Sequence, residues 1–333
     1  MRITTDDYHT AGEPFRIVTG GAPVPEGSTL LERRDWVMNH ADDVRKLLIN
    51  EPRGHADMYG CHLVPPDDDG AAFGAIFFHK DGYSLACGHG TIALGTWAVE
   101  TGRVDASPDG ATDVVIDVPS GRVVARVLTQ SGRAISAVFR NVAAYVTARQ
   151  VEVATRAGSV AADVSWGGAA FASVRASDLG LEVSPSDLPS LIELGREIKW
   201  ALNDHPSARH PTDPRLSGVY GTVLWEEVEG GGDDLHQRNV TVFADGQVDR
   251  SPCGSATTAR TALLAADSRI DEESVFVHHS IVGTRFVARI VERTTVHGEP
   301  AVVTEVEGSA HRTGRHEFLL DAADELGTGF QLR

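Results

Sequence analysis

The segment Ser84-Leu85-Ala86-Cys87-Gly88-His89-Gly90-Thr91-Ile92-Ala93-Leu94-Gly95 has a counterpart in the second half of the chain, Asp249-Arg250-Ser251-Pro252-Cys253-Gly254-Ser255-Ala256-Thr257-Thr258-Ala259-Arg260. Both contain the pattern Cys-Gly-x-x-Thr-x-Ala, and each follows a phenylalanine and an Asp-Gly turn. The cysteines are 253 − 87 = 166 positions apart in a chain of 333 residues. We interpret the pattern as an internal duplication in which each half supplies one cysteine on a strand, turn and helix.

The composition is that of an ordinary globular protein, with 41% hydrophobic and 23% charged residues. The formal net charge is −17, and the absence of a basic cluster argues against a nucleic-acid partner. The sequence has no apolar run long enough for a membrane helix and no secretory signal, so no membrane association is expected. Three cysteines are too few for a disulfide framework, and we expect a cytoplasmic location.

Hydrophobic periodicity and turn residues predict a strand-rich α/β (α+β) chain with few helices. One helix should follow each cysteine, at 88–100 and from Cys253 to about 266. Two further helices are predicted, at 28–50 with Ser28 as the N-cap, and from 186 or 187 to 202 with an apolar inner face of Leu188, Leu191, Leu194, Ile198 and Leu202. The duplication divides the chain into 1–122, to which 312–333 returns, and 123–311. The glycine-rich segment 229–233 is predicted to be an exposed loop.

A cysteine at the start of a helix lies close to unpaired backbone N–H groups and to the positive end of the helix dipole. Such a position favours the thiolate and can lower the cysteine pKa from about 8.5 by a unit or more. The following glycines, Gly88 and Gly254, let a ligand approach the backbone closely. If the two helix starts face each other across a cleft, they form a pocket suited to a small carboxylate.

Two acid/base groups on opposite faces of one carbon atom can racemise it. One thiolate would remove the Cα proton, the opposite thiol would deliver another, and the N–H groups would stabilise the enolate-like carboxylate. We expect no cofactor and no metal for this chemistry. Gly88, Gly90 and Gly95 lack the spacing of a dinucleotide-binding loop. A zinc site of Cys87, His89 and Cys253 would need another ligand and would leave the duplicated helix starts unexplained.

The segments 87–92 and 249–254 resemble the first and second catalytic motifs of the proline racemase family. His9-Thr10-Ala11-Gly12-Glu13-Pro14-Phe15-Arg16, Trp166-Gly167-Gly168 and Gly329-Phe330 are also similar to family segments, so the resemblance covers nearly the whole chain. It implies the diaminopimelate epimerase-like fold, which has two pseudo-symmetric halves, each a curled sheet around a central helix. It also implies a homodimer.

The resemblance implies roles for the motif residues. Cys87 and Cys253 would be the acid/base pair, and Asp249 would meet the amino group of an imino-acid substrate. The substrate carboxylate would be held by Gly88, His89, Gly254 and Ser255.

The resemblance implies cofactor-independent epimerisation of proline or hydroxyproline. We expect a 4-hydroxyproline 2-epimerase, which converts trans-4-hydroxy-L-proline to cis-4-hydroxy-D-proline, or a proline racemase. Gly90 resembles the residue of the hydroxyproline enzymes more than that of the proline racemases. The segment 52–60 resembles the branch that includes trans-3-hydroxyproline dehydratases, which usually carry Thr or Ser at the second cysteine position. Because Cys253 is present, we favour epimerisation over dehydration.

Several alternatives stay open. The same pocket could dehydrate trans-3-hydroxy-L-proline or epimerise 3-hydroxyproline, and the chain could instead be a non-catalytic imino-acid binding protein or a thiol redox sensor. Among single residues, Cys61 is expected to be a buried structural cysteine, and Asp249 could cap the turn before Cys253. Ala169 stands where relatives often have Asn. His278 and His279 are expected on the surface of a strand.

Overall fold

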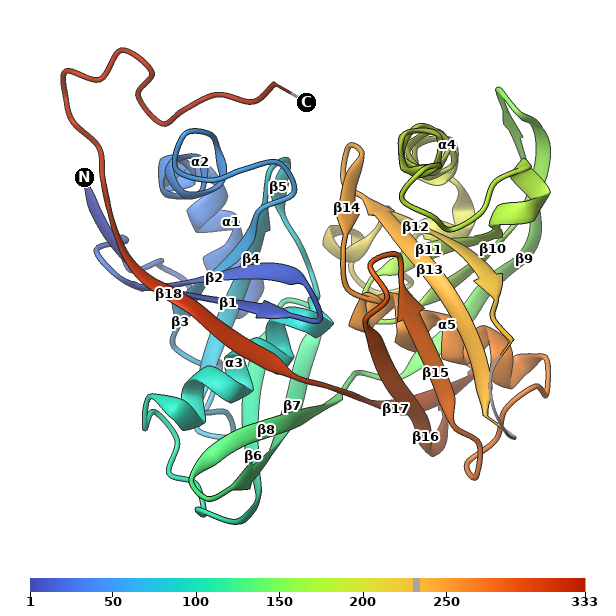
Figure 1. The fold of residues 1–333 in the computed structure, drawn as a ribbon, viewed down its shortest axis with the longest axis horizontal. Coiled ribbons are helices and arrows are strands. Elements are labelled where there is room, and N and C mark those ends of the chain that lie inside the picture. Colours follow the sequence, from blue (N-terminus) through green and yellow to red (C-terminus); the bar gives the residue numbers. More distant parts are fainter. Residues whose placement is uncertain (230–233, 333) are drawn as a thin grey trace. The chain divides into compact units, whose positions relative to one another are not determined.

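The computed structural model describes residues 1–229 and 234–332, so most of the predicted loop at 229–233 lies outside the described residues. The chain forms two compact units, Met1–Val138 with Ser309–Arg333, and Phe139–Gly308. The two units are coloured by sequence in Figure 1. Each unit is a curved sheet with a buried helix, in a mixed α/β arrangement.

The first unit is built around helix α3. Its sheet runs in the order β18, β1, β2, β3, β4, β6, β7, with the short β5 paired to the end of β4. The elements are β1 (Arg2–Thr10), β2 (Glu13–Gly20), α1 (Leu30–His40), α2 (Asp42–Ile49), β3 (Tyr59–Val64), β4 (Phe73–His79), β5 (Gly82–Tyr83), α3 (Gly88–Glu100), β6 (Gly110–Val118), β7 (Gly121–Gln130) and β18 (Ala310–Leu319).

The second unit is built in the same way around helix α5. Its sheet runs β9, β10, β11, β12, β13, β15, β16, β17, and β17 pairs back to β9. The elements are β9 (Ala144–Thr155), β10 (Gly158–Trp166), β11 (Ala170–Arg175), α4 (Leu188–Leu202), β12 (Val219–Glu227), β13 (Leu235–Phe243), β14 (Gln247–Asp249), α5 (Gly254–Ala266), β15 (Phe276–Ser280), β16 (Arg285–Val296) and β17 (Glu299–Gly308). Strand β8 (Arg133–Arg140) carries the chain from the first unit into the second.

The two units repeat one topology, which confirms the pseudo-symmetric halves. In the first, β2 and β3 are parallel, β4 and β5 form a hairpin, α3 follows, and β4 then pairs parallel to β6. In the second, β11 and β12 are parallel, β13 and β14 form a hairpin, α5 follows, and β13 pairs parallel to β15. An Asp-Gly turn found in the sequence connects the two strands of each hairpin, and the cysteine follows a few residues later.

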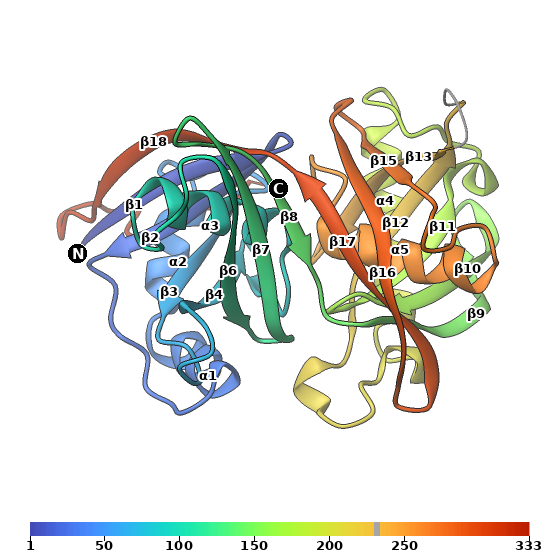
Figure 2. The ribbon, with the colours of Figure 1, turned by 90° about the horizontal axis from the view of Figure 1, so that it is seen from below.

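Both central helices consist mainly of small and apolar residues, and the sheets enclose them. Residues 88–98 of α3 and 254–265 of α5 are buried, as is typical of helices in a protein core. On α3, a Cβ at Gly95 would lie 2.5 Å from the Cβ of Ala125 in β7. Figure 2 shows α3 beside β6 and β7, and α5 beside β16 and β17.

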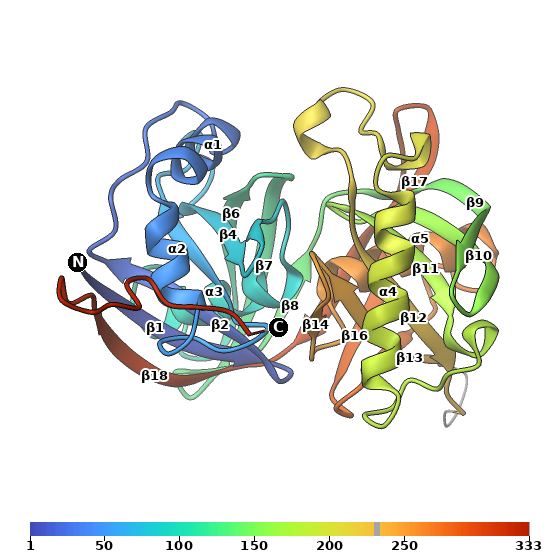
Figure 3. The same cartoon turned by 90° about the horizontal axis from the view of Figure 1, so that it is seen from above.

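Helix α4 covers the other face of the second sheet, over β11, β12 and β13 (Figure 3). Its predicted inner face is confirmed, since Leu191, Leu194, Ile198 and Leu202 pack in one apolar cluster with valines of these strands and of β9 and β10. The sheet is thereby buried on both faces, by α4 on one and by α5 on the other.

The predicted helix at 28–50 is two helices, α1 and α2. The chain breaks at Ala41, whose φ of −137° and ψ of 21° are not helical, and whose N–H closes the last turn of α1. The N-cap is Thr29 rather than Ser28, and it forms a reciprocal capping box with Glu32. The two helices place Val37, Val44, Leu47 and Leu48 in the core of the first unit.

The structural division of the chain lies later than the expected one at 122. The reason is that β6 and β7 form one hairpin, in which Val118 pairs with Gly121. A cut at 122 would separate its two strands. The returning segment begins at Ser309, and β18 pairs along the whole of β1, from Arg2 with Leu319 to Thr10 with Ala310. In the described part of the chain, no helix has the length and apolar character needed to cross a membrane.

Gly95 gives a test of the close packing around α3. Glycine to alanine inside a helix usually stabilises it by about 1 kcal/mol. Here the added methyl would collide with Ala125, so we expect Gly95→Ala to lower the free energy of unfolding by about 1–3 kcal/mol in urea titrations. In an Ala125→Gly background the same substitution should cost less. An unchanged or higher stability in the single variant would contradict this packing.

Candidate active site

Cys87 caps the central helix of the first unit. It has extended backbone angles (φ −154°, ψ 103°), and its Sγ accepts a hydrogen bond from the N–H of Gly90 at 3.2 Å. The side chain therefore occupies the place that a serine or aspartate oxygen takes at an ordinary N-cap. A hydrogen bond from a helix N-terminal amide favours the thiolate form of a sulfur, and the thiolate of Cys87 stays a prediction.

His89 lies directly against this sulfur. Both ring nitrogens of His89 are 3.5 Å from Sγ of Cys87. The ring is held edge-on by Phe15, with centroids 5.7 Å apart, and by Tyr59 at 5.0 Å. The carbonyl of His89 accepts a bond from the Thr10 hydroxyl at 2.9 Å. His89 is thus a fixed neighbour of the cysteine.

Gly90 is required by the shape of this site. A Cβ at position 90 would lie 2.6 Å from the Phe15 ring and 2.7 Å from Sγ of Cys87. Such distances are too short for any real side chain. The glycine therefore lets Phe15 and the sulfur pack against the same backbone.

Cys253 caps α5 in a different way. Its φ of 60° and ψ of 103° lie outside the regions that non-glycine residues favour, and its side chain makes no capping bond within the described residues. Such a conformation costs about 1–3 kcal/mol and persists where the surroundings impose it. Both cysteines are buried, with 5% of Cys87 and 7% of Cys253 exposed.

The turn before Cys253 is held by Asp249. Its Oδ1 accepts from the N–H of Ser251 at 2.8 Å and from the Ser251 hydroxyl at 2.6 Å. The hydroxyl oxygen in turn accepts from the N–H of Cys253 at 3.1 Å. Asp249 therefore has the capping role that the sequence left open, and a role in binding substrate stays a prediction.

Ser255 and the Trp166-Gly167-Gly168 segment lie at the first turn of α5. Oγ of Ser255 is buried and has no hydrogen-bond partner among the described residues. A Cβ at Gly167 would lie 2.4 Å from the carbonyl oxygen of Ser255, so only glycine fits against this turn. Ala169 packs with Cys253 and Ala256 in one apolar cluster, and a polar residue at 169 would disturb that cluster.

Each unit therefore gathers its own share of the predicted residues. Cys87, Gly88 and His89 lie at the start of α3, and Cys253, Gly254 and Ser255 lie at the start of α5, next to Asp249. Sequence reasoning gave no role to the residues outside the two motifs that support them. In the first unit these are Thr10, Phe15 and Tyr59; in the second they are Asn141, Asn239, Thr241 and His278.

The prediction that His278 lies on a strand surface is wrong. Its side chain is fully buried and bonded at both ring nitrogens, to Thr257 and to Asn239. Burial, followed by the nearby Arg260 and His279, holds the pKa of His278 well below its usual value. A single histidine in a strand carries no sequence signal that separates a buried network from an exposed face. His279 does point outward in part, and bonds His236.

Cys61 is confirmed as a buried residue of β3. Burial raises the pKa of its thiol well above the usual value, so the thiolate is disfavoured. Unlike Cys87 and Cys253, Cys61 lies inside a strand and not at the start of a helix.

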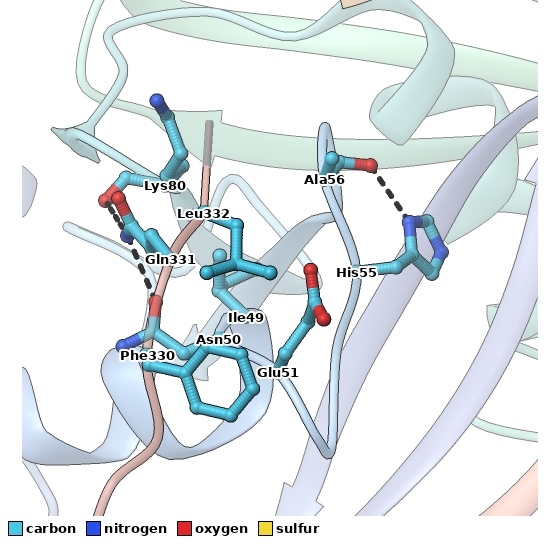
Figure 4. A pocket seen from close by; sticks show the side chains of 9 residues that line it. All are labelled: Ile49, Asn50, Glu51, His55, Ala56, Lys80, Phe330, Gln331 and Leu332. Carbon is cyan, nitrogen blue, oxygen red and sulfur yellow. Dashed lines mark hydrogen bonds between the residues drawn. The ribbon is translucent and has the colours of Figure 1, made fainter.

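A small pocket in the first unit lies beside the returning C-terminal segment (Figure 4). Phe330 pairs through its backbone with Glu51, and Gln331 bonds the side chain of Asn50. The pocket has a volume of about 10 Å³, room for about one water molecule. It is too small for an imino acid, and its neighbours hold the C-terminal segment in place.

Comparisons with known proteins agree with these motifs. The family model described as proline racemase matches residues 6–331. The chain is 41% identical to a trans-3-hydroxy-L-proline dehydratase of Bacillus cereus (99% of this chain, 98% of the relative) and 43% identical to a 3-hydroxyproline 2-epimerase of Burkholderia multivorans (again 99% and 98%). A crystal structure of a hydroxyproline epimerase from Agrobacterium vitis, with bound trans-4-hydroxy-L-proline, superposes with a TM-score of 0.92 at 30% identity, over 99% of this chain and 96% of that one. The chain belongs to the proline racemase family.

Proposed function

We propose that this protein is a cofactor-independent epimerase that inverts the α-carbon of a hydroxyproline, with Cys87 and Cys253 as the acid/base pair. One observation carries the proposal. Cys87 and Cys253 are the N-cap residues of two buried helices, α3 and α5. These helices occupy equivalent places in the repeated fold. A duplicated pair of thiols matches a reaction in which the same proton transfer occurs on both faces of one carbon.

The proton transfers balance without an oxidant or reductant. The thiolate of one cysteine takes the α-proton and becomes a thiol, and the C–H bond on that face breaks. The thiol of the other cysteine gives its proton to the opposite face and becomes a thiolate. The pair thus exchanges protonation states in each turnover, and the two sulfurs titrate as a coupled system.

Backbone amides at the two helix starts would bind the substrate carboxylate and stabilise the charge that develops on it. These amides belong to Gly88 and His89 in the first unit and to Gly254 and Ser255 in the second. The buried Ser255 hydroxyl, which has no partner among the described residues, supports a polar ligand at this position. Asp249 would accept a hydrogen bond from the ring ammonium.

For the ring substituent we propose trans-3-hydroxy-L-proline as the first candidate substrate. The names of the relatives at 41% and 43% identity both contain 3-hydroxyproline, whereas the structure with bound trans-4-hydroxy-L-proline is 30% identical. The 4-hydroxy isomer, which the motif resemblance favoured, is the second candidate.

Dehydration is the competing reaction, favoured by the name of the Bacillus cereus relative. In that reaction the α-proton is removed, the C3–O bond breaks, and the hydroxyl group leaves as water after it gains a proton. The resulting enamine rearranges to a pyrroline carboxylate. This reaction needs a base on one face alone, so Cys253 favours epimerisation.

Incubation in heavy water separates these reactions. We expect trans-3-hydroxy-L-proline to gain deuterium at Cα with inversion, followed by NMR and chiral chromatography, because the returning proton comes from a solvent-exchanged thiol. Trans-4-hydroxy-L-proline and L-proline are run in parallel. Pyrroline detected with o-aminobenzaldehyde, without the inverted epimer, would establish dehydration instead. No exchange with any of the three compounds would remove the proposal.

Serine at either catalytic cysteine should lower the rate of inversion strongly. A hydroxyl is a far weaker acid than a thiol, so Cys87→Ser and Cys253→Ser should each reduce kcat by about 10²–10⁴-fold, the usual contribution of a positioned acid or base. The matched control is Cys61→Ala, which removes the third cysteine from the core. Its activity per folded molecule should stay within about twofold of the parent protein. Near-normal inversion by either serine variant would exclude a two-thiol mechanism.

A further inference from the structure

The two halves differ in how the threonine of the repeated motif is used. Thr91 and Thr257 both close the first helical turn through their N–H groups, which bond the carbonyls of Cys87 and Cys253 at 2.9 and 2.7 Å. The Thr91 hydroxyl donates to the same carbonyl of Cys87, at 2.8 Å. The Thr257 hydroxyl instead lies 3.3 Å from the carbonyl oxygen of Pro252 and 2.9 Å from Nδ1 of His278.

His278 completes a closed set of hydrogen bonds around the Pro252 carbonyl. Nε2 of His278 lies 2.7 Å from the side-chain nitrogen of Asn239, and that nitrogen also donates to the Pro252 carbonyl at 3.0 Å. The amide oxygen of Asn239 is fixed by the Thr241 hydroxyl at 3.2 Å. These four side chains are fully buried, so water cannot replace any bond that is lost.

The donors and acceptors fix one tautomer of His278. The Thr257 hydroxyl uses its hydrogen on the Pro252 carbonyl, so it accepts from Nδ1–H of His278. Nε2 then carries no hydrogen and accepts from the Asn239 amide. The neutral ring thereby serves as donor on one side and acceptor on the other, which the protonated form cannot do. Burial keeps the ring in this neutral form.

The Pro252 carbonyl belongs to the peptide unit that joins Pro252 to Cys253. Orienting this carbonyl orients the N–H of Cys253, which the Ser251 hydroxyl holds from the other side. Rotation about φ of Cys253 is thereby restricted at the unusual value of 60°. At Cys87 the backbone is relaxed and the sulfur itself accepts the capping bond, so no comparable network is required there.

We propose that His278, acting through Thr257 and Asn239, is a positioning residue that fixes the backbone of Cys253 and hence the direction of its thiol. Its catalytic consequence depends on the proposed two-thiol function, but the positioning itself does not. These hydrogen bonds support the second cysteine and not the first. A substitution in the network should therefore change the position of the Cys253 thiol and leave that of Cys87 unchanged.

The test uses the full chain and matched substitutions. His278→Phe keeps a ring of similar size without either bond, and His279→Phe makes the same change at the neighbouring residue, which faces His236 instead. Thr257→Val removes the hydroxyl while preserving the shape, and Thr257→Ser keeps the hydroxyl. Thermal unfolding and circular dichroism identify the folded variants. If His278→Phe does not fold, the comparison of Thr257→Val with Thr257→Ser still tests the proposal.

The first measurement requires no substrate. Brief alkylation with iodoacetamide, followed by peptide mass spectrometry, gives the ratio of modification at Cys253 to that at Cys87. Alkylation requires the thiolate, which is favoured when the thiol stays at the helix start. We expect this ratio to fall by about threefold or more in His278→Phe and Thr257→Val, and to be unchanged in His279→Phe and Thr257→Ser.

The second measurement compares exchange with inversion in heavy water. A misplaced Cys253 leaves Cys87 able to remove an α-proton and return a deuteron to the same face. Exchange with retention should therefore rise relative to inversion by about tenfold in His278→Phe and Thr257→Val, a part of what a positioned acid or base contributes. A substitution that merely lowers the amount of folded protein would reduce both rates equally.

The outcomes are separable. Unchanged alkylation and unchanged exchange ratios in folded His278→Phe or Thr257→Val protein would overturn the positioning role. A shifted alkylation ratio, together with no exchange by the parent protein on any hydroxyproline, would overturn the proposed function while supporting the positioning of Cys253.

Discussion

When a curved sheet encloses a helix, the N–H groups of the first helical turn need hydrogen-bond partners inside the protein. The first amides of any helix have no partner within it, and on α3 and α5 these amides lie inside the protein because the helices are buried almost throughout. Each must be met by a side chain, by the backbone or by a ligand. The fold therefore presents N–H donors in a dry setting, and its sequence places a cysteine and a glycine there in both units.

The same constraint explains the small residues. The sheets approach α3 and α5 so closely that glycine is needed where backbone or side chains meet them, at Gly95 against Ala125, at Gly167 against Ser255, and at Gly90 against Phe15. Packing and chemistry are joined at Gly90 in particular, since the space that a side chain would fill is taken by Phe15 and the Cys87 sulfur. A substitution in the core next to either helix start should therefore change the position of the adjacent thiol.

The duplication has diverged in its details. The first helix start is a conventional cap in which the sulfur accepts Gly90 N–H. The second holds its cysteine in a strained backbone supported by Asp249 and Ser251 on one side and by the buried polar set of Asn239, Thr257 and His278 on the other. Repeated topology therefore does not imply that the two thiols are held with equal rigidity. In the part of the chain that the structure describes, both the N–H and the hydroxyl of Thr91 bond the Cys87 carbonyl.

The sequence by itself determined the repeat, the class of fold, the helices behind the two cysteines and the inner face of α4, because these features are local patterns of a few residues. It failed at Ala41, where the apolar period continues through a break between two helices, and at His278, whose strand neighbours do not reveal which face is buried. Only the tertiary structure decided the surroundings of each sulfur. Phe15 and Tyr59 reach His89 from separate strands, and Asn239 and His278 reach the Cys253 turn from β13 and β15. Contacts between residues far apart in the chain leave no local pattern. The alternation of apolar and polar residues in a strand is the same whichever residues of other strands contact it.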